Sequence, residues 1–99
     1  MGVDKKIDYL ERPISYENKL ESSFEVFQVL GNDAALAREV SDGNGYITIY
    51  MGNTVLLIGE NFYSNQVVHV RHPQRIGTYQ YTNNGGMPMT VPVIEGEMY

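Results

Sequence analysis

The sequence contains no cysteine and no tryptophan, and its basic residues are few. The absence of cysteine excludes disulfides, thiolate zinc sites and a cysteine nucleophile together. Seven Lys and Arg against twelve Asp and Glu give a net charge of −5. The chain therefore lacks the overall positive charge that supplies most non-specific affinity for nucleic acids and anionic membranes. No run approaches the roughly 20 apolar residues of a transmembrane helix, so we predict no membrane insertion.

Tyrosine, by contrast, is abundant. Eight tyrosines stand beside three phenylalanines. Tyrosine suits half-buried positions, because its ring is apolar and its hydroxyl is polar, and a thin-walled β-barrel has many such positions. The length of 99 residues, with 42% hydrophobic and 19% charged residues, indicates one folded domain with a single modest core.

Residues 1–23 differ from the rest of the chain. They hold most of the lysines, and their apolar residues are sparse. Ile7 and Leu10 are three positions apart, which allows one short helical turn before Pro13 ends it. We predict that 1–23 is a polar lead-in, with a short helix at most, and that 24–99 is a small β-barrel domain.

From Phe24 onward, short runs of β-branched and aromatic residues alternate with clusters of Gly, Asn and Asp, as strands and turns do. The runs that we predict as strands are 24–30, 34–40, 46–50, 54–58, 66–70, 77–82 and 89–94. Turns are expected at 42–45, at Gly52-Asn53 and at Pro73. The continuous apolar run at 54–58 predicts burial on both faces.

Six or seven strands at a spacing of about 8–12 residues predict an all-β fold, a small partly open barrel of the SH3-like or OB-like kind. Pro92 cannot donate a ladder hydrogen bond, so we expect it at a sheet edge or a bulge. The run at 34–40 is composed of good helix formers, but it is short for a helix between two turns, and we predict a strand there.

Several of these runs together resemble a group of small bacterial proteins that carry an export signal and have no assigned activity. The matching runs are 24–30, 35–37, 55–57, 62–68, 77–81 and 90–93. The resemblance implies an exported bacterial β-domain and carries over no functional residue. It implies a periplasmic or cell-envelope location if a leader has been removed, and a cytoplasmic location otherwise.

The most polar stretch of the β region, 68–75, contains both histidines and two arginines. His69 and His72 are three apart, so on a strand they point to opposite faces. Zinc also takes three or four protein ligands. We therefore predict a strand that ends in a solvated basic loop, with no metal.

We predict no catalytic residue and no cofactor. The chain has no Gly-x-Ser-x-Gly elbow, and no glycine-rich phosphate loop follows a strand and opens a helix. A hydrolase would require His69 or His72 within hydrogen-bond reach of a carboxylate in a cleft.

The remaining class is a non-enzymatic binding or interaction module. It would recognise a protein, a peptide or a glycan, or pair with its own copy through a sheet edge as a homodimer. Phe62 and Tyr63 are candidate loop contacts, although they could instead plug an end of the barrel. The full set of candidate binding residues is Phe62, Tyr63, Arg71, His72, Arg75, Tyr79 and Tyr81.

The alternative is single-stranded nucleic-acid binding through an OB-like face. Arg71, His72 and Arg75 would supply the positive charge, and Tyr79 and Tyr81 would stack on bases. The acidic net charge argues against this reading. It also requires the basic loop and the tyrosines to share one side of the sheet.

Overall fold

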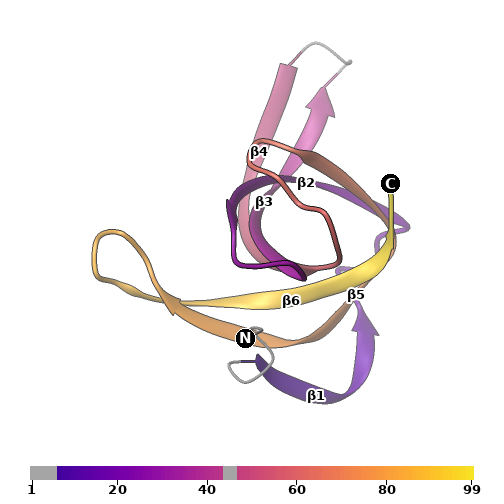
Figure 1. The fold of residues 1–99 in the computed structure, drawn as a ribbon. Helices are drawn as coiled ribbons and strands as arrows, with labels where there is room; N and C mark the ends of the chain where they lie inside the picture. Colours follow the sequence, from indigo (N-terminus) through magenta and orange to yellow (C-terminus); the bar gives the residue numbers. More distant parts are fainter. Residues whose placement is uncertain (1–6, 44–46) are drawn as a thin grey trace.

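A computed structural model describes the backbone of residues 7–43 and 47–99 and the side chains of 7–40 and 52–99. These residues form six strands and no helix (Figure 1), which confirms the all-β prediction. The strands are β1 (Ile7–Ser15), β2 (Glu21–Val29), β3 (Ala34–Gly43), β4 (Ile47–Ile58), β5 (Val67–Thr82) and β6 (Pro88–Met98). The described chain thus has no helix long and apolar enough to cross a membrane. Residues 44–46 lie outside the described residues. They include part of the predicted turn at 42–45 and the first residue of the predicted strand 46–50.

Five of the strands close into a barrel in the order β2-β3-β4-β6-β5, and β5 pairs again with β2. Neighbouring strands are antiparallel except β4 and β6, which are parallel. This parallel pairing of the third and fifth barrel strands makes the connectivity a Greek key, as in OB-like barrels. The β4–β6 ladder has two residue pairs, Leu56–Val93 and Leu57–Ile94. The barrel that the sequence predicted as partly open is therefore closed, by its shortest ladder.

The barrel interior is filled by alternate residues of its strands. Phe24 and Val26 of β2 lie against Ala35 and Ala37 of β3, and all four are fully buried. The cluster also contains Tyr16 of the β1–β2 connection and the inward side chains of β4, β5 and β6: Val55, Leu57, Val68, Val70 and Ile94. β3 pairs with β2 on one side and with β4 on the other, and this tertiary pairing overrides the helix propensity of its residues.

A second apolar cluster covers the outer face of the same wall. Leu36 and Leu56 point away from the interior, and they pack with Tyr79, Val91 and Val93 from the β5–β6 hairpin. β3 and β4 are therefore buried on both faces, as the continuous apolar run at 54–58 predicted. The hairpin reaches across the outside of the barrel to make this contact (Figure 1).

Residues 7–15 are extended, so the expectation of a short helix in the lead-in is wrong. β1 pairs antiparallel with β5, joining Ile7 to Tyr79 and Tyr9 to Gly77. A Cβ on Gly77 would lie 2.5 Å from the carbonyl oxygen of Asp8. The strand therefore depends on a close tertiary contact that its own sequence does not show, and the segment packs on the barrel.

The turns predicted at Gly52-Asn53 and at Pro73 are also wrong, because β4 and β5 continue through them. Gly52 has φ +86° where the β3–β4 register shifts. His72 has φ +52°, and the buried Pro73 follows it where the β5–β6 register shifts. These residues bend long strands instead of ending them. Two predicted strands thereby merge in β4 and two in β5.

Candidate functional site

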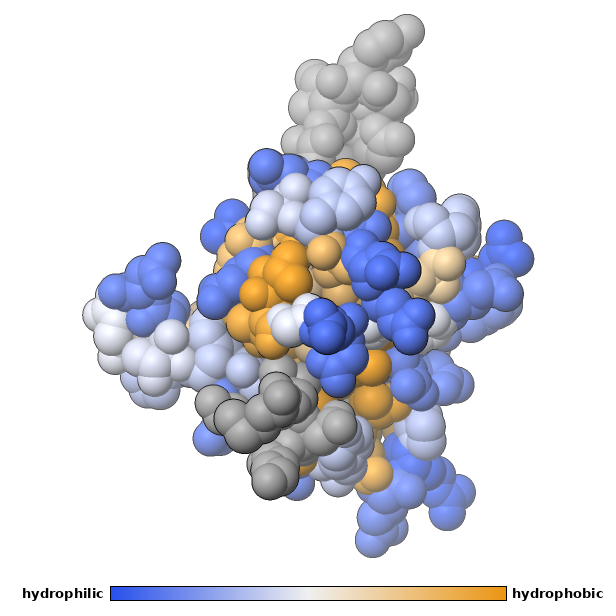
Figure 2. Space-filling model, in the orientation of Figure 1, coloured by the Kyte–Doolittle hydropathy of each residue, from blue (hydrophilic) through white to orange (hydrophobic). Residues whose placement is uncertain are grey.

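A groove of about 910 Å³ runs along the outside of the barrel. One wall comes from β2 and β3, with Phe27, Leu36 and Arg38. The other comes from the β5–β6 hairpin, with Tyr79 and the residues that follow it. The hairpin projects from the barrel and its tip is polar, whereas apolar surface on this face gathers over the barrel (Figure 2). The volume is within the usual range of ligand sites.

The exposed aromatic ring of the groove belongs to Phe27, which lies at a β-bulge. In the β2–β3 ladder Val26 pairs with Ala37 and Gln28 with Leu36, so Phe27 has no partner. Strand alternation after the buried Val26 places Phe27 on the outer face, where it is 37% exposed. The bulge leaves the next residue, Gln28, exposed beside it, and Gln28 also lines the groove. The ring is capped by a cation, because the Arg38 guanidinium lies 4.9 Å from its centroid.

Two tyrosines from β5 contribute to the opposite wall. The rings of Tyr79 and Tyr81 are stacked, with centroids 6.1 Å apart and planes inclined by 21°. Tyr79 is buried in the outer cluster, and Tyr81 is half-buried. Tyr81 and Phe27 are therefore the aromatic groups that a ligand in the groove can reach.

The polar lining of the groove is almost uncharged. It consists of amides and hydroxyls: Gln28, Thr54, Gln80, Thr82, Asn83 and Asn84. Asn83 shapes the hairpin tip, since its Oδ1 accepts hydrogen bonds from the backbone N–H groups of Gly85 (2.9 Å) and Met87 (3.0 Å). Among the described lining residues Arg38 is the one charged group.

The predicted site residues are dispersed over the molecule. Tyr79 and Tyr81 line the groove, but Arg71 and His72 lie near the other end of the bent strand β5. Arg71 binds the Glu97 carboxylate at 3.1 Å and covers the Tyr99 ring at 5.3 Å. The structure therefore does not bring the basic stretch and the tyrosines into one site.

The other three predicted residues occupy separate places. Arg75 lines a second cavity of about 540 Å³. Phe62 is partly buried and packs against the barrel interior, as the plug interpretation requires, while Tyr63 beside it is 63% exposed. Neither lines the groove.

Neither histidine has a carboxylate at hydrogen-bond distance in the described part of the chain. His69 Nδ1 lies 2.8 Å from the Ser23 Oγ of the facing strand, and the His69 ring packs on Tyr99 at 5.5 Å. Within the same described residues, no group of three or more acidic or histidine side chains could hold a metal ion.

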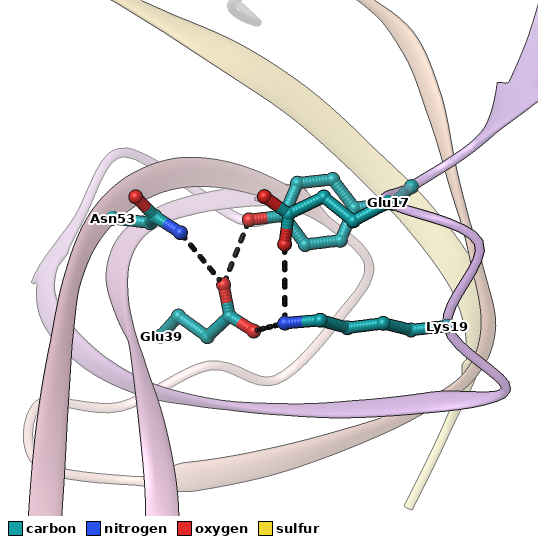
Figure 3. A network of polar contacts seen from close by, with 5 residues as sticks. Glu17, Lys19, Glu39 and Asn53 are labelled. Carbon is teal, nitrogen blue, oxygen red and sulfur yellow. Dashed lines mark hydrogen bonds and ion pairs between the residues drawn. The ribbon is translucent and has the colours of Figure 1, made fainter.

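One buried carboxylate was not anticipated from the sequence. Glu39 is 3% exposed, and its Oε1 accepts hydrogen bonds from Tyr16 Oη at 2.8 Å and Asn53 Nδ2 at 3.1 Å. Its Oε2 accepts a short hydrogen bond from Lys19 Nζ, which also binds Glu17 at 3.1 Å (Figure 3). The network ties the β1–β2 connection to β3 and β4.

The titration of these groups follows from their contacts. Burial alone would raise the pKa of Glu39, but hydrogen bonds from Lys19, Asn53 and Tyr16 outweigh it and hold the pKa below its usual value. The hydrogen bond to Glu39 raises the pKa of Lys19. Burial, and then the Glu39 carboxylate, raise the pKa of Tyr16. Glu39 is thus an ionised, fully satisfied structural group.

Sequence reasoning also missed Phe27 and Arg38, although both left a signal. Phe24 and Val26 occupy one face of the strand, so alternation places Phe27 on the opposite face with Glu25, where a large apolar side chain stands out. Likewise, Arg38 and Glu39 interrupt an otherwise apolar strand between Ala37 and Val40. Two adjacent charged residues on such a strand must face opposite sides, so one of them faces the protein.

These features define the class: a small Greek-key β-barrel whose outer face carries a partly aromatic groove with Arg38 as its one charged group among the described lining residues. Comparison with protein-family models, with curated proteins and with solved structures found no match for this chain.

Proposed function

We propose that this protein is a non-enzymatic binding module that takes an oligosaccharide in the outer groove. The observation that carries the proposal is the groove's lining, in which exposed aromatic surface is flanked by amides and hydroxyls. Groups that both donate and accept hydrogen bonds match sugar hydroxyls, which do the same. The apolar face of a sugar ring can lie on Phe27 or Tyr81.

The position of the groove supports the same reading. OB-like barrels bind oligosaccharides and oligonucleotides on the face of their second and third strands, beside the loops that join strands one to two and four to five. The corresponding strands here are β3 and β4, and the corresponding loops join β2 to β3 and β5 to β6. Leu30 and Asn83, from these two connections, both line the groove.

A single-stranded nucleic acid is less well supported. Binding a phosphate chain requires several cations, and the groove offers Arg38 alone. Arg71, which would have added positive charge, is remote from the groove and paired with Glu97.

Recognition of a peptide or a second copy through a sheet edge is also less favoured. β1 is the strand with an open edge, but its pairing with β5 is interrupted between Tyr9 and Ile14. The interruption contains Pro13 and the charged residues Glu11 and Arg12. Bulges, prolines and charges are the features by which edge strands avoid adding another strand.

A periplasmic or cell-envelope location, as the resemblance implies, would place the domain among glycan polymers.

The test is a titration of the full chain with neutral oligosaccharides and, separately, with a single-stranded DNA oligomer. Backbone amide chemical shifts are recorded by NMR at each step of the titration. We expect saccharides to shift resonances of Phe27, Arg38 and Asn83. Phe27→Ala should weaken binding about tenfold, which is the loss expected for an aromatic contact residue. Tyr63→Ala, an exposed tyrosine outside the groove, is the matched control and should have no effect. Binding of DNA but of no saccharide would overturn the proposal.

A further inference from the structure

The second cavity adjoins the groove. Its volume is about 540 Å³, and it opens where β4 and β6 separate beyond their short ladder. Thr54 and Met89 line both spaces, so a chain lying in the groove can continue past them into the cavity. Arg75 lines the cavity but not the groove, as do Asn53 and Thr90.

Arg75 is a cation without a counter-ion in the described part of the chain. Its Nε is buried and has no hydrogen-bond partner. Lys19 and Arg71, in contrast, each bind a carboxylate. Glu17 also lines the cavity, but Lys19 already pairs with it. Arg75 is therefore a cavity-lining cation whose charge no carboxylate of the described residues neutralises, and a carboxylate that enters the cavity can pair with its guanidinium.

We infer that the ligand carries a carboxylate, and that Arg75 recognises it as the acid group of a uronic acid unit. The inference rests on the proposed function, because the uronic acid would be one unit of the oligosaccharide bound in the groove. Arginine binds carboxylates through two parallel hydrogen bonds. Thr90 and Asn53 supply further polar groups for the ring hydroxyls.

The surroundings limit the ligand to one acid group at this place. Glu17 and Glu39 carry two negative charges near the cavity, and Lys19 balances one of them. Arg75 is the one cation among these four groups that is not already in an ion pair. A single ligand carboxylate can pair with Arg75, whereas a second carboxylate would find no free cation among them and would be repelled by the glutamates.

The experiment compares two ligands by calorimetry: a tetrasaccharide with one glucuronate unit, and the same tetrasaccharide with that carboxylate reduced to an alcohol. The wild-type chain should bind the acidic form about tenfold more tightly, which is the effect of one charge-assisted hydrogen-bonded pair. Arg75→Gln should abolish this preference and leave the affinity for the reduced form unchanged. Arg12→Gln removes an exposed arginine of β1 that lines neither space and should preserve the preference.

Chemical-shift mapping on the wild-type chain locates the acid group even if Arg75→Gln folds poorly. Both ligands should shift Asn53 and Thr90, which face the ring hydroxyls, and the acidic ligand alone should shift Arg75. Equal binding of both ligands, with equal shifts at Arg75, would overturn the inference and leave the proposed function intact. Failure of both tetrasaccharides to bind would overturn the inference and the proposed function together.

Discussion

At the scale of single residues, the structure separates side chains that serve the fold from those free to serve a ligand. Glu39 is the clearest member of the first group, because both of its oxygens are occupied by protein donors. Arg75 and Phe27 belong to the second, since Arg75 lines a cavity without an ion pair in the described part of the chain and Phe27 lies on the outward face of β2. Composition cannot make this distinction. An unpaired arginine and a paired one read the same in the sequence.

Glu39→Gln tests the structural role. The change should lower the free energy of unfolding at pH 7 by about 1–3 kcal/mol, because it weakens charge-assisted hydrogen bonds at a buried position. Chemical denaturation of both proteins measures the difference. Glu17→Gln, half-exposed at the edge of the same network, is the matched control and should change stability by about 0.5 kcal/mol or less. Equal losses in the two variants would contradict the assignment.

The pH dependence of the network follows from the directions of its pKa shifts. The folded pKa of Glu39 is lowered, so its contribution is complete above the unfolded value of about 4.3 and is lost as the pH falls through the folded pKa. The folded pKa values of Lys19 and Tyr16 are raised. Their contributions are complete below their unfolded values of about 10 and are lost as the pH rises through the folded pKa values. The difference in stability between the wild type and Glu39→Gln should therefore be flat from about pH 5 to 9 and shrink on both sides. A difference that keeps growing below pH 4 would contradict this sign.

At the scale of elements, the sequence predicted the strands whose patterns are local and failed where pairing is not local. The runs from Phe24 and from Ala34 form β2 and β3 as expected. β1 was missed because its burial comes from β5, and nothing within 1–23 shows that partner. Gly52 and Pro73 were interpreted as turns because positive φ and proline usually end strands. Here Gly52 and Pro73 lie at register shifts, and pairing with the neighbouring strands resumes on the other side of each shift, so β4 and β5 continue.

Gly77→Ala tests how β1 is held. The new Cβ would meet the Asp8 carbonyl oxygen at 2.5 Å, so β1 must move away from β5. We expect a loss of about 1–3 kcal/mol, as for other overpacked positions. Hydrogen exchange should show reduced protection at Ile7 to Tyr9, with the barrel strands unchanged. Gly85→Ala, in the exposed hairpin tip with only the Asn83 side chain nearby at 3.4 Å, is the control. Full protection of β1 in Gly77→Ala would exclude the tight contact.

At the scale of the whole molecule, the sequence predicted a small barrel, but neither its closure nor its groove. Closure depends on the parallel contact of Leu56 and Leu57 with β6, two elements separated by the whole of β5. The groove exists because the β5–β6 hairpin lies over the outer face of β3. Both are products of the topology. Neither can be read from one segment of the sequence. For this reason the predicted site residues include two that line the groove, Tyr79 and Tyr81, and omit Phe27 and Arg38.

The two apolar clusters should behave as one cooperative unit, because β3 and β4 form the wall between them. Leu57 points into the interior cluster and Leu36 into the outer one, and both are at most 1% exposed. Either Leu→Ala change should cost about 2–5 kcal/mol. Denaturation of both variants is followed by circular dichroism, in the far UV for the strands and in the near UV for the tyrosines. The two transitions should coincide, as two-state unfolding requires. If Leu36→Ala instead lost the near-UV circular dichroism of its tyrosines before the strands unfolded, the outer cluster would be a separate unit. The groove would then be held by a hairpin that can detach from the barrel, and its affinity for ligand would fall with the fraction of molecules in which the hairpin is docked.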